Sequence, residues 1–301
     1  MKRIRSKFIR LAVIALGIAS AHANAITAFA CEPEWGALLK ALAPNAKVIV
    51  ATSAYLDPHY IEARPSLISA LRSADIAVCT GAGLEVGWLP VLLKRASNPA
   101  IQQGQPGLVY ASQVINTIDK HETHFLQTGH VHPEGNPHFH LDPKRLMSVA
   151  ALVTERLIEI DAQNGIHYLK THQQWHTHWL AQIAHWQQLA SPLRDRKVVS
   201  QHSSFDYLWH WLGMQKVADL EPQPGVPPTL SHLNELVSTV KQERPLGIVS
   251  TWYQSPKSAS WLSDKTGVPA LSLPATVSDQ NESATLEALF NHLISELLSR
   301  S

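Results

Sequence analysis

Short apolar runs alternate with amphipathic segments along most of the chain from residue 26 onward. In the first half, the pattern predicts strands at residues 26–32, 46–53, 75–81 and 107–112, with helices at residues 33–43, 64–74 and 87–97. In the second half it predicts strands at residues 196–203, 216–220, 246–251 and 268–273, with helices at residues 205–213, 229–244, 258–267 and 284–299. Strands that alternate with helices are typical of βαβ units. The pattern therefore predicts an α/β fold with two lobes, each with a mostly parallel sheet flanked by helices.

Two helical segments separate these halves. Residues 142–160 predict a helix with Asp142 as its N-cap and Pro143 at its first position. Residues 166–190 follow, with apolar side chains at roughly helical spacing, and would extend for about 40 Å. A helix that covers one small sheet can be shorter, so we expect this one to brace both lobes. The expected division is a first lobe at residues 26–142, a helical connection at residues 143–194 and a second lobe at residues 195–301.

The first 25 residues have the layout of a secretory signal peptide. Five of the first ten residues are basic, an apolar run follows at residues 11–21, and "AHANA" places small residues at the spacing of a cleavage site. The alternative is a membrane anchor, but the apolar run has about half of the roughly 20 residues that a spanning helix needs. We therefore expect cleavage after Ala23 or Ala25 and export of the mature protein.

Export changes the interpretation of the two cysteines, Cys31 and Cys79. Each ends a predicted strand, so a disulfide could join them if those strands are neighbours in one sheet. Two buried free thiols are the main alternative. Lipid attachment at Cys31 is a weaker one, because "AFAC" lacks the usual leucine three positions earlier and lies beyond the expected cleavage region.

The composition points to metal handling rather than to nucleic acid. The formal net charge of +1 provides no electrostatic basis for binding a polyanion. The chain has 17 histidines, against three methionines and two cysteines. Imidazole is the commonest protein ligand for first-row metals, and zinc takes about four N, O or S ligands in a tetrahedron.

Three histidines stand near predicted strand ends or helix starts, where the loops of α/β lobes converge. His59 follows the strand at residues 46–53, His138 precedes the first long helix, and His202 follows the first strand of the second half. Each is weak evidence alone, but two positions in one lobe and one in the other describe a cleft between lobes. The proline-flanked "NPHFHLDP" is poor helix material, so we expect it to be extended, with His138 and His140 on one face.

Two other groups of histidines have weaker patterns. "HETHF" does not match the helical metalloprotease motif, because His121 and His124 are three positions apart rather than four. His172 and His176 have the i,i+4 spacing of a metal-binding helix face, but no carboxylate accompanies them. A structural or solvent-exposed role is the stronger expectation for this second pair.

With these residues in place, the chain closely resembles the metal-specific solute-binding proteins of ABC transporters, of the zinc-uptake (ZnuA-like) kind. The motifs that carry the resemblance are "DPHYIEARPS", "ADIAVCTGAGLEVGWLP", "NPHFHLDP", "VVSQHSSFDYLWHWLG" and "TGVPALSLP", in order across nearly the whole mature chain. The resemblance implies two α/β lobes linked by a long rigid helix, with the metal between them, bound by His59, His138 and His202. Manganese-binding relatives tend to have glutamate at the position of His202, so histidine there favours Zn²⁺. Zinc members also typically carry a mobile histidine-rich loop, here at residues 121–132.

The fourth ligand is less well defined by the resemblance. Many relatives have tryptophan at the position of His140, so its role is open among metal ligand, partner of a ligand and packing. An aspartate of the second lobe is a frequent ligand in the family, and Asp279 stands a few residues beyond the expected position. Asp279 is our candidate for the fourth ligand, with Glu62, His140 and water as the alternatives.

The sequence thus predicts a periplasmic, non-catalytic protein that captures Zn²⁺ between two lobes and delivers it to an inner-membrane ABC permease. A periplasmic zinc chaperone is a further candidate partner, and we expect a monomer. The alternative is a secreted zinc-dependent hydrolase that uses the same histidines and an open water position. It needs a general base beside the metal, for which only Glu62 and Asp279 are candidates, and neither stands in a catalytic motif. A metal-dependent adhesion protein is a third interpretation, but nothing in the sequence supports an anchor.

Overall fold

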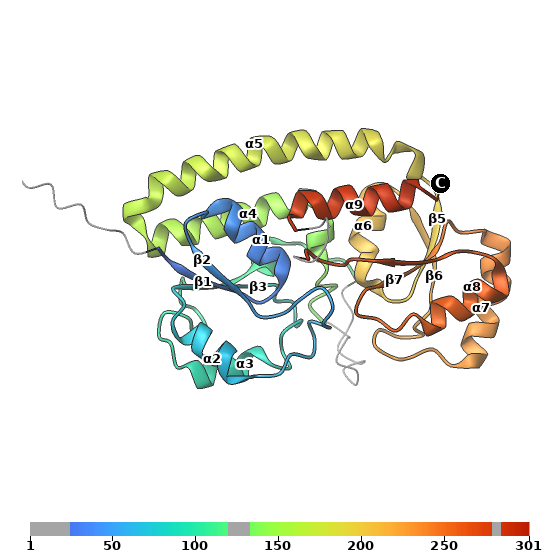
Figure 1. Ribbon diagram of the computed structural model, residues 1–301, viewed down its shortest axis with the longest axis horizontal. Coiled ribbons are helices and arrows are strands. Elements are labelled where there is room, and N and C mark those ends of the chain that lie inside the picture. Colours follow the sequence, from blue (N-terminus) through green and yellow to red (C-terminus); the bar gives the residue numbers. More distant parts are fainter. Residues whose placement is uncertain (1–24, 120–132, 279–283, 301) are drawn as a thin grey trace, which may run out of the picture.

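The computed structural model describes residues 25–119, 133–278 and 284–300, and it contains two four-stranded parallel sheets (Figure 1). The first sheet has the order β2-β1-β3-β4. Its strands are β1 (Thr27–Ala30), β2 (Lys47–Val50), β3 (Ile76–Cys79) and β4 (Leu108–Tyr110), and the helices between them are α1 (Pro33–Leu42), α2 (Pro65–Arg72) and α3 (Leu89–Ala96). A proline stands in the first turn of all three helices, where its missing N–H would have no partner within the helix.

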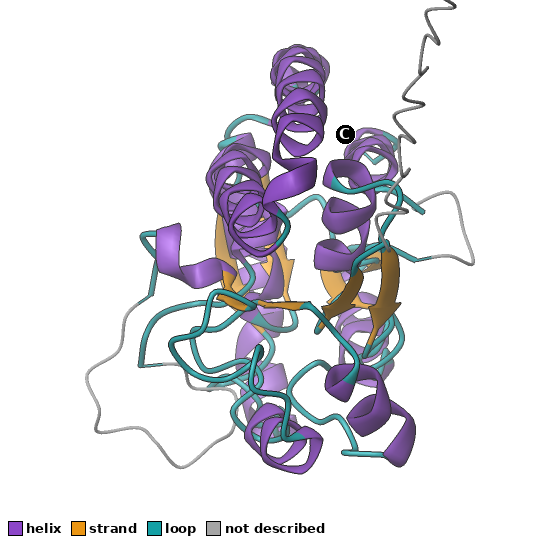
Figure 2. Ribbon diagram, turned by 90° about the vertical axis from the view of Figure 1, so that its left-hand side faces the viewer, coloured by secondary structure: helices purple, strands orange, loops and turns teal. Residues whose placement is uncertain are grey.

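The second sheet repeats this topology with the order β6-β5-β7-β8. Its strands are β5 (Lys197–Ser200), β6 (Gln215–Asp219), β7 (Ile248–Thr251) and β8 (Ala270–Leu273), and its helices are α6 (Asp206–Leu212), α7 (Leu230–Glu243), α8 (Lys257–Thr266) and α9 (Leu286–Leu298). Helices lie on both sides of the strands (Figure 2). The predicted two-lobed α/β fold is confirmed. The chain order of the strands reverses at β1 and at β5, and the carboxyl ends of strands at such a reversal are the usual ligand sites of α/β proteins.

Two long helices connect the lobes, α4 (Pro143–Ile160) and α5 (Gly165–Leu189). As predicted, Asp142 caps α4, because its carboxylate accepts a hydrogen bond of 3.0 Å from the Lys144 backbone N–H. α5 has 25 residues, packs against α1 and α4, and also contacts α9 near the end of the chain. Figure 1 shows that it extends over both lobes, so the predicted long bracing helix is confirmed.

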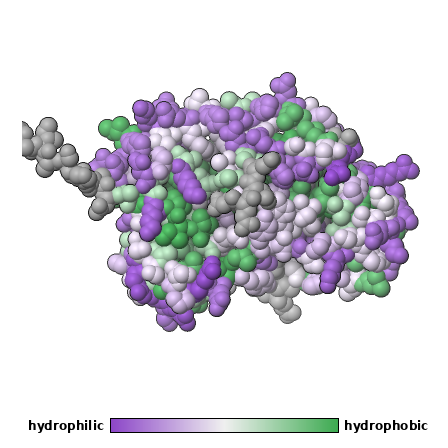
Figure 3. All heavy atoms as spheres, in the orientation of Figure 1, coloured by the Kyte–Doolittle hydropathy of each residue, from purple (hydrophilic) through white to green (hydrophobic). Residues whose placement is uncertain are grey.

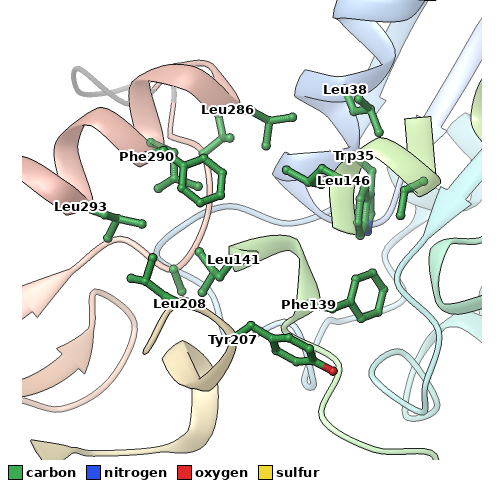
Figure 4. Packing of buried hydrophobic residues seen from close by; sticks show 14 of the residues in the cluster. Trp35, Leu38, Phe139, Leu141, Leu146, Tyr207, Leu208, Leu286, Phe290 and Leu293 are labelled. Carbon is green, nitrogen blue, oxygen red and sulfur yellow. The ribbon is translucent and has the colours of Figure 1, made fainter. Parts of the chain in front are cut away.

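One apolar core is shared by the two lobes. It includes Trp35 of α1 and Leu141, which precedes α4, together with Leu208 of α6 and Phe290 of α9 (Figure 4). Trp186 of α5 packs on Phe290 with a ring-centroid distance of 5.0 Å. Because close-packed interiors tolerate little displacement, this shared core resists relative movement of the lobes.

A disulfide joins Cys31 and Cys79, as the sequence predicted for neighbouring strands. β1 pairs with β3 in parallel, so the two strands bring their carboxyl ends together. The two Cα atoms are 4.8 Å apart, and both cysteines are fully buried. The bridge closes a separation of 48 residues and ties the carboxyl ends of the two central strands together.

The surface and the N-terminal segment are relevant to the predicted export of the protein. Among the described residues, none of the helices combines the length and the apolar character needed to cross a bilayer. Along α5, hydrophilic side chains are mixed with exposed apolar ones such as Ile166 and Leu180, and apolar side chains also gather on the face of the first lobe that Figure 3 presents. The predicted signal peptide lies outside the described residues, apart from Ala25.

Candidate metal centre

His59 lies in a turn that follows β2. The Asp57 carboxylate accepts a hydrogen bond of 3.0 Å from the His59 backbone N–H, which is an Asx turn. The Trp88 indole N–H donates to the Pro58 carbonyl at 2.9 Å and ties this turn to the body of the first lobe. His59 is 4% exposed, so the turn directs its imidazole inward rather than into solvent.

The segment with His138 forms a tight turn, and the extended conformation that we predicted for it is wrong. Residues Phe139–Leu141 form the 3₁₀ helix η3, and the Leu141 N–H donates to the His138 carbonyl at 3.2 Å. The Asn136 side chain starts the turn by accepting a hydrogen bond of 2.9 Å from the His138 N–H. Flanking prolines exclude a long helix here, but they do not exclude a three-residue turn.

His202 stands two positions after the end of β5, close to the strand end as predicted. It stands at the N-cap of the short 3₁₀ helix η6 (Ser203–Phe205) and is 5% exposed. The Asn136 amide group, which accepts from the His138 N–H, also donates to the Ser203 carbonyl at 2.9 Å. One side chain of the first half therefore holds both the His138 turn and the backbone beside His202.

The structure brings these three histidines together between the two lobes. The ring centroids are 6.0 Å apart for His59 and His138, 5.9 Å for His138 and His202, and 6.4 Å for His59 and His202. Three imidazoles on one tetrahedral zinc, each with an N–Zn distance of about 2.1 Å, have centroids about 5 Å apart. The rings are thus about 1 Å further apart than in a closed zinc site, a difference that small side-chain rotations can remove.

Two of the three imidazoles have a carboxylate behind them. Nδ1 of His59 lies 2.6 Å from Asp57 Oδ1, and Nδ1 of His202 lies 2.8 Å from Glu221 Oε2. A carboxylate that accepts from Nδ1–H selects the tautomer with its lone pair on Nε2 and makes that nitrogen a stronger ligand. These two pairs favour metal binding through Nε2, and their negative charges lie where a divalent cation needs compensation.

Within the described ranges, the structure does not place the other candidate ligands from the sequence among the three imidazoles. His140 is buried, and its ring centroid lies 6.3 Å from that of His138, but its nitrogens face Glu34 and the Ala275 carbonyl. Glu62 is exposed to solvent. Asp279 and the histidine-rich loop at residues 121–132 lie outside the described residues, so the fourth ligand stays a prediction.

His172 and His176 on α5 do not form a metal site with a third potential ligand in the part of the chain that the structure describes, in agreement with the structural or solvent-exposed role expected for them. The rings of His172 and His176 are 5.9 Å apart, and both side chains are half-buried. Burial, with a smaller effect of the neighbouring His176, lowers the pKa of His172. No third His, Cys, Asp or Glu side chain among the described residues joins this pair in a group of potential ligands.

Comparison with known proteins identifies the family. The model of the family described as "ZnuA: Zinc-uptake complex component A periplasmic" matches residues 29–299. The chain belongs to this family. A search of the curated proteins found no match.

Solved structures of ZnuA-like proteins share the fold. A crystal structure of ZnuA has 20% identity and a TM-score of 0.78, and the match covers 92% of this chain and all of that one. A zinc-bound deletion mutant of ZnuA has 21% identity and a TM-score of 0.74 over 90% of this chain and 97% of the other. The solute-binding protein FpvC from Pseudomonas aeruginosa in complex with Mn²⁺ has 18% identity and a TM-score of 0.73, with 91% and 97% covered.

Sequence reasoning missed three residues that organise the centre of this ZnuA-family protein. Asp57 stands two positions before His59, and Asn136 two positions before His138, so each had a local signal, that of an Asx turn. Glu221 had none, because it is 19 positions from His202 and reaches it from the end of the neighbouring strand β6.

A second group of polar residues surrounds the disulfide but is not a metal site. The Cys31 and Cys79 sulfurs lie within 4.8 Å of a Glu85 carboxylate oxygen, but sulfurs in a disulfide are not thiolate ligands. Glu85 and Glu32 both accept a hydrogen bond from the Thr80 N–H, at 2.6 and 3.2 Å. Burial raises the pKa of Glu85 to about 7, and burial together with the Glu85 charge raises that of Glu32. The two carboxyl groups therefore form a buried pair that favours holding a proton.

Proposed function

We propose that this protein captures Zn²⁺ between its two lobes through His59, His138 and His202 and delivers it to an inner-membrane ABC permease. The observation that supports this most directly is the convergence of three buried imidazoles from both lobes, with ring centroids 5.9–6.4 Å apart. The family, described as a periplasmic component of a zinc-uptake complex, is the context in which we interpret this convergence.

The chemistry of the donor set favours zinc as the cargo. Imidazole nitrogen suits Zn²⁺ well, whereas Mn²⁺ is better matched by carboxylate, carbonyl and water oxygens. Neutral imidazoles bring no charge, so the Asp57 and Glu221 carboxylates behind two of them compensate the dication. Three protein ligands also leave a fourth position, for which Asp279 remains our candidate.

Native mass spectrometry with metal analysis of the mature protein tests the proposal. We expect one tightly held zinc per chain and at least a tenfold loss of affinity when His59, His138 or His202 is replaced by alanine, because each supplies one of about four bonds. His185→Ala is the control, since His185 is an exposed histidine on α5 and should leave binding unchanged.

Competition with Mn²⁺ and Cd²⁺ tests the choice of metal. Zinc should displace Mn²⁺ readily, in agreement with the general order of divalent-metal affinities and with nitrogen ligands. Wild-type zinc binding in all three single alanine variants would show that the centre is elsewhere. If the protein binds Mn²⁺ tightly and zinc does not displace it, the three histidines can still be the metal site, but the transported metal is then not zinc.

A further inference from the structure

Each nitrogen of the His140 ring has a polar neighbour that is not one of the proposed metal ligands. Nε2 lies 2.7 Å from the Ala275 carbonyl oxygen, which can only accept, so Nε2 carries the proton of this hydrogen bond. Nδ1 lies 3.2 Å from Glu34 Oε1. His140 precedes α4 at the end of the first half of the chain, whereas Ala275 follows β8 in the second sheet. The ring therefore connects two parts of the chain 135 positions apart.

Glu34 makes a second connection to the same segment. Its other carboxylate oxygen, Oε2, accepts a hydrogen bond from the Thr276 hydroxyl, 242 positions away in the chain. Glu34 is 2% exposed and His140 is 4% exposed, so these contacts are shielded from competing water. A buried carboxylate needs such partners, because without them its burial is strongly unfavourable.

The connected residues share a groove with His138, one of the three proposed metal ligands. Glu34, His138, His140, Ala275 and Thr276 line one groove. The Trp35 ring contacts the His140 ring edge-on at 6.3 Å. The hydrogen bonds of Glu34 and His140 thus hold two consecutive residues of the second lobe beside His138.

We propose that Glu34 and His140 form a latch that fastens residues 275–276 to the first lobe and slows release of the metal held between the lobes. This inference rests on the proposed function, because the latch acts on the metal that the three histidines bind. An ion between two lobes leaves only when the surrounding segments separate, and the latch must break in that step. Among variants of one binding site, dissociation rates vary more than association rates, so we expect the latch to affect dissociation more than association.

Zinc dissociation into excess chelator, followed by stopped flow, tests the latch. Thr276→Val removes the hydroxyl that donates to Glu34 while keeping the shape of the side chain, and it should speed release several-fold. His140→Phe removes the hydrogen bond to Ala275 and the Nδ1 contact with Glu34 while keeping an aromatic ring beside Trp35, and it should speed release by at least tenfold. His140→Gln can place an amide nitrogen near the position of Nε2 and keep the bond to Ala275, so it should restore most of the slow release.

The two variants should also be coupled. Because Glu34 contacts both the Thr276 hydroxyl and the His140 ring, Thr276→Val should add less in the His140→Phe background than in the wild type. The control is His178→Phe, which removes an exposed histidine–carboxylate contact of 2.7 Å between α5 and α9 and should leave release unchanged. Association rates should stay within about threefold of wild type in every variant.

Wild-type release rates in Thr276→Val and His140→Phe would overturn the latch. If His140→Phe does not fold, Thr276→Val and His140→Gln decide the question. If the wild-type protein binds no zinc, the proposed function fails, and the latch is then judged by hydrogen exchange of residues 270–278 in the metal-free protein. The latch predicts faster exchange there in Thr276→Val, and unchanged exchange would contradict it.

Discussion

Replacing Glu221 tests whether the carboxylate behind His202 controls metal affinity. Glu221 Oε2 accepts from His202 Nδ1 at 2.8 Å and from the Gly225 N–H at 2.7 Å. Glu221→Gln can keep both hydrogen bonds through its amide oxygen but loses the negative charge. Glu221→Ala loses the charge and both bonds. The two variants therefore separate the effect of charge from that of orientation.

The magnitude follows from the burial of the pair. Partners of a metal-binding histidine typically change metal affinity by about 10–100-fold. That range corresponds to about 1.4–2.8 kcal/mol, at about 1.4 kcal/mol for each factor of ten. The Glu221 side chain is only 12% exposed, so water screens its charge poorly. We expect about 100-fold weaker zinc binding for Glu221→Ala and about tenfold for Glu221→Gln.

Competition titration against a chromophoric zinc chelator measures both affinities. Glu287→Ala is the matched control, because Glu287 also accepts from a histidine, His178, at 2.7 Å but on the surface between α5 and α9. Thermal unfolding of the metal-free variants shows whether a loss of affinity comes from a loss of fold. The reasoning is refuted if Glu221→Ala binds zinc as tightly as wild type while His202→Ala does not bind it.

Three further predictions concern the loop, the buried acid pair and the lobes. Deletion of residues 121–132, which lie outside the described residues, should remove weak extra zinc equivalents in equilibrium dialysis and spare the tight one. Loss of the tight equivalent would place a primary ligand in that loop. Burial raises the pKa of Glu85 to about 7 from its ordinary value of 4.5, so the folded protein keeps a proton that the unfolded chain has released. The free energy of unfolding should therefore fall by about 3 kcal/mol as pH rises from about 4.5 to 7. Urea titrations should show that Glu85→Gln, which has no proton to release, flattens this dependence, and an unchanged slope would contradict the prediction. Solution scattering should show nearly equal radii of gyration with and without zinc, because the shared core resists rotation of the lobes. Clear compaction on zinc binding would instead indicate a hinge.

Some parts of the centre were predictable because their cause is local. Asp142 caps α4 through a hydrogen bond to Lys144, only two positions away, and a cap of this kind is encoded in adjacent residues. The turn at His138 was not predicted correctly, although its cause is also local. The flanking prolines favour an extended backbone, but the Asx turn that Asn136 forms determines the backbone at His138.

The contacts that give the centre its electrostatic character depend on tertiary structure. Glu221 reaches His202 because β6 lies beside β5 in the sheet, and strand order is not readable from the local pattern. The surroundings of His140 depend on tertiary structure even more strongly. Its sequence context left its role open among metal ligand, partner of a ligand and packing. Only the tertiary structure places the Ala275 carbonyl beside Nε2 and the Glu34 carboxylate beside Nδ1.

The sequence by itself determined the α/β class, the two parallel sheets, the long bracing helix, the pairing of Cys31 with Cys79 as one alternative, and three histidines near strand ends and helix starts. These follow from hydrophobic periodicity and from residue types at element boundaries, which act over a few positions. Only the tertiary structure decided which side chains surround the imidazoles, that the disulfide forms, and that Glu34 and His140 contact residues 275–276. Such contacts arise from how elements pack against one another, because burial brings together residues that no local pattern relates.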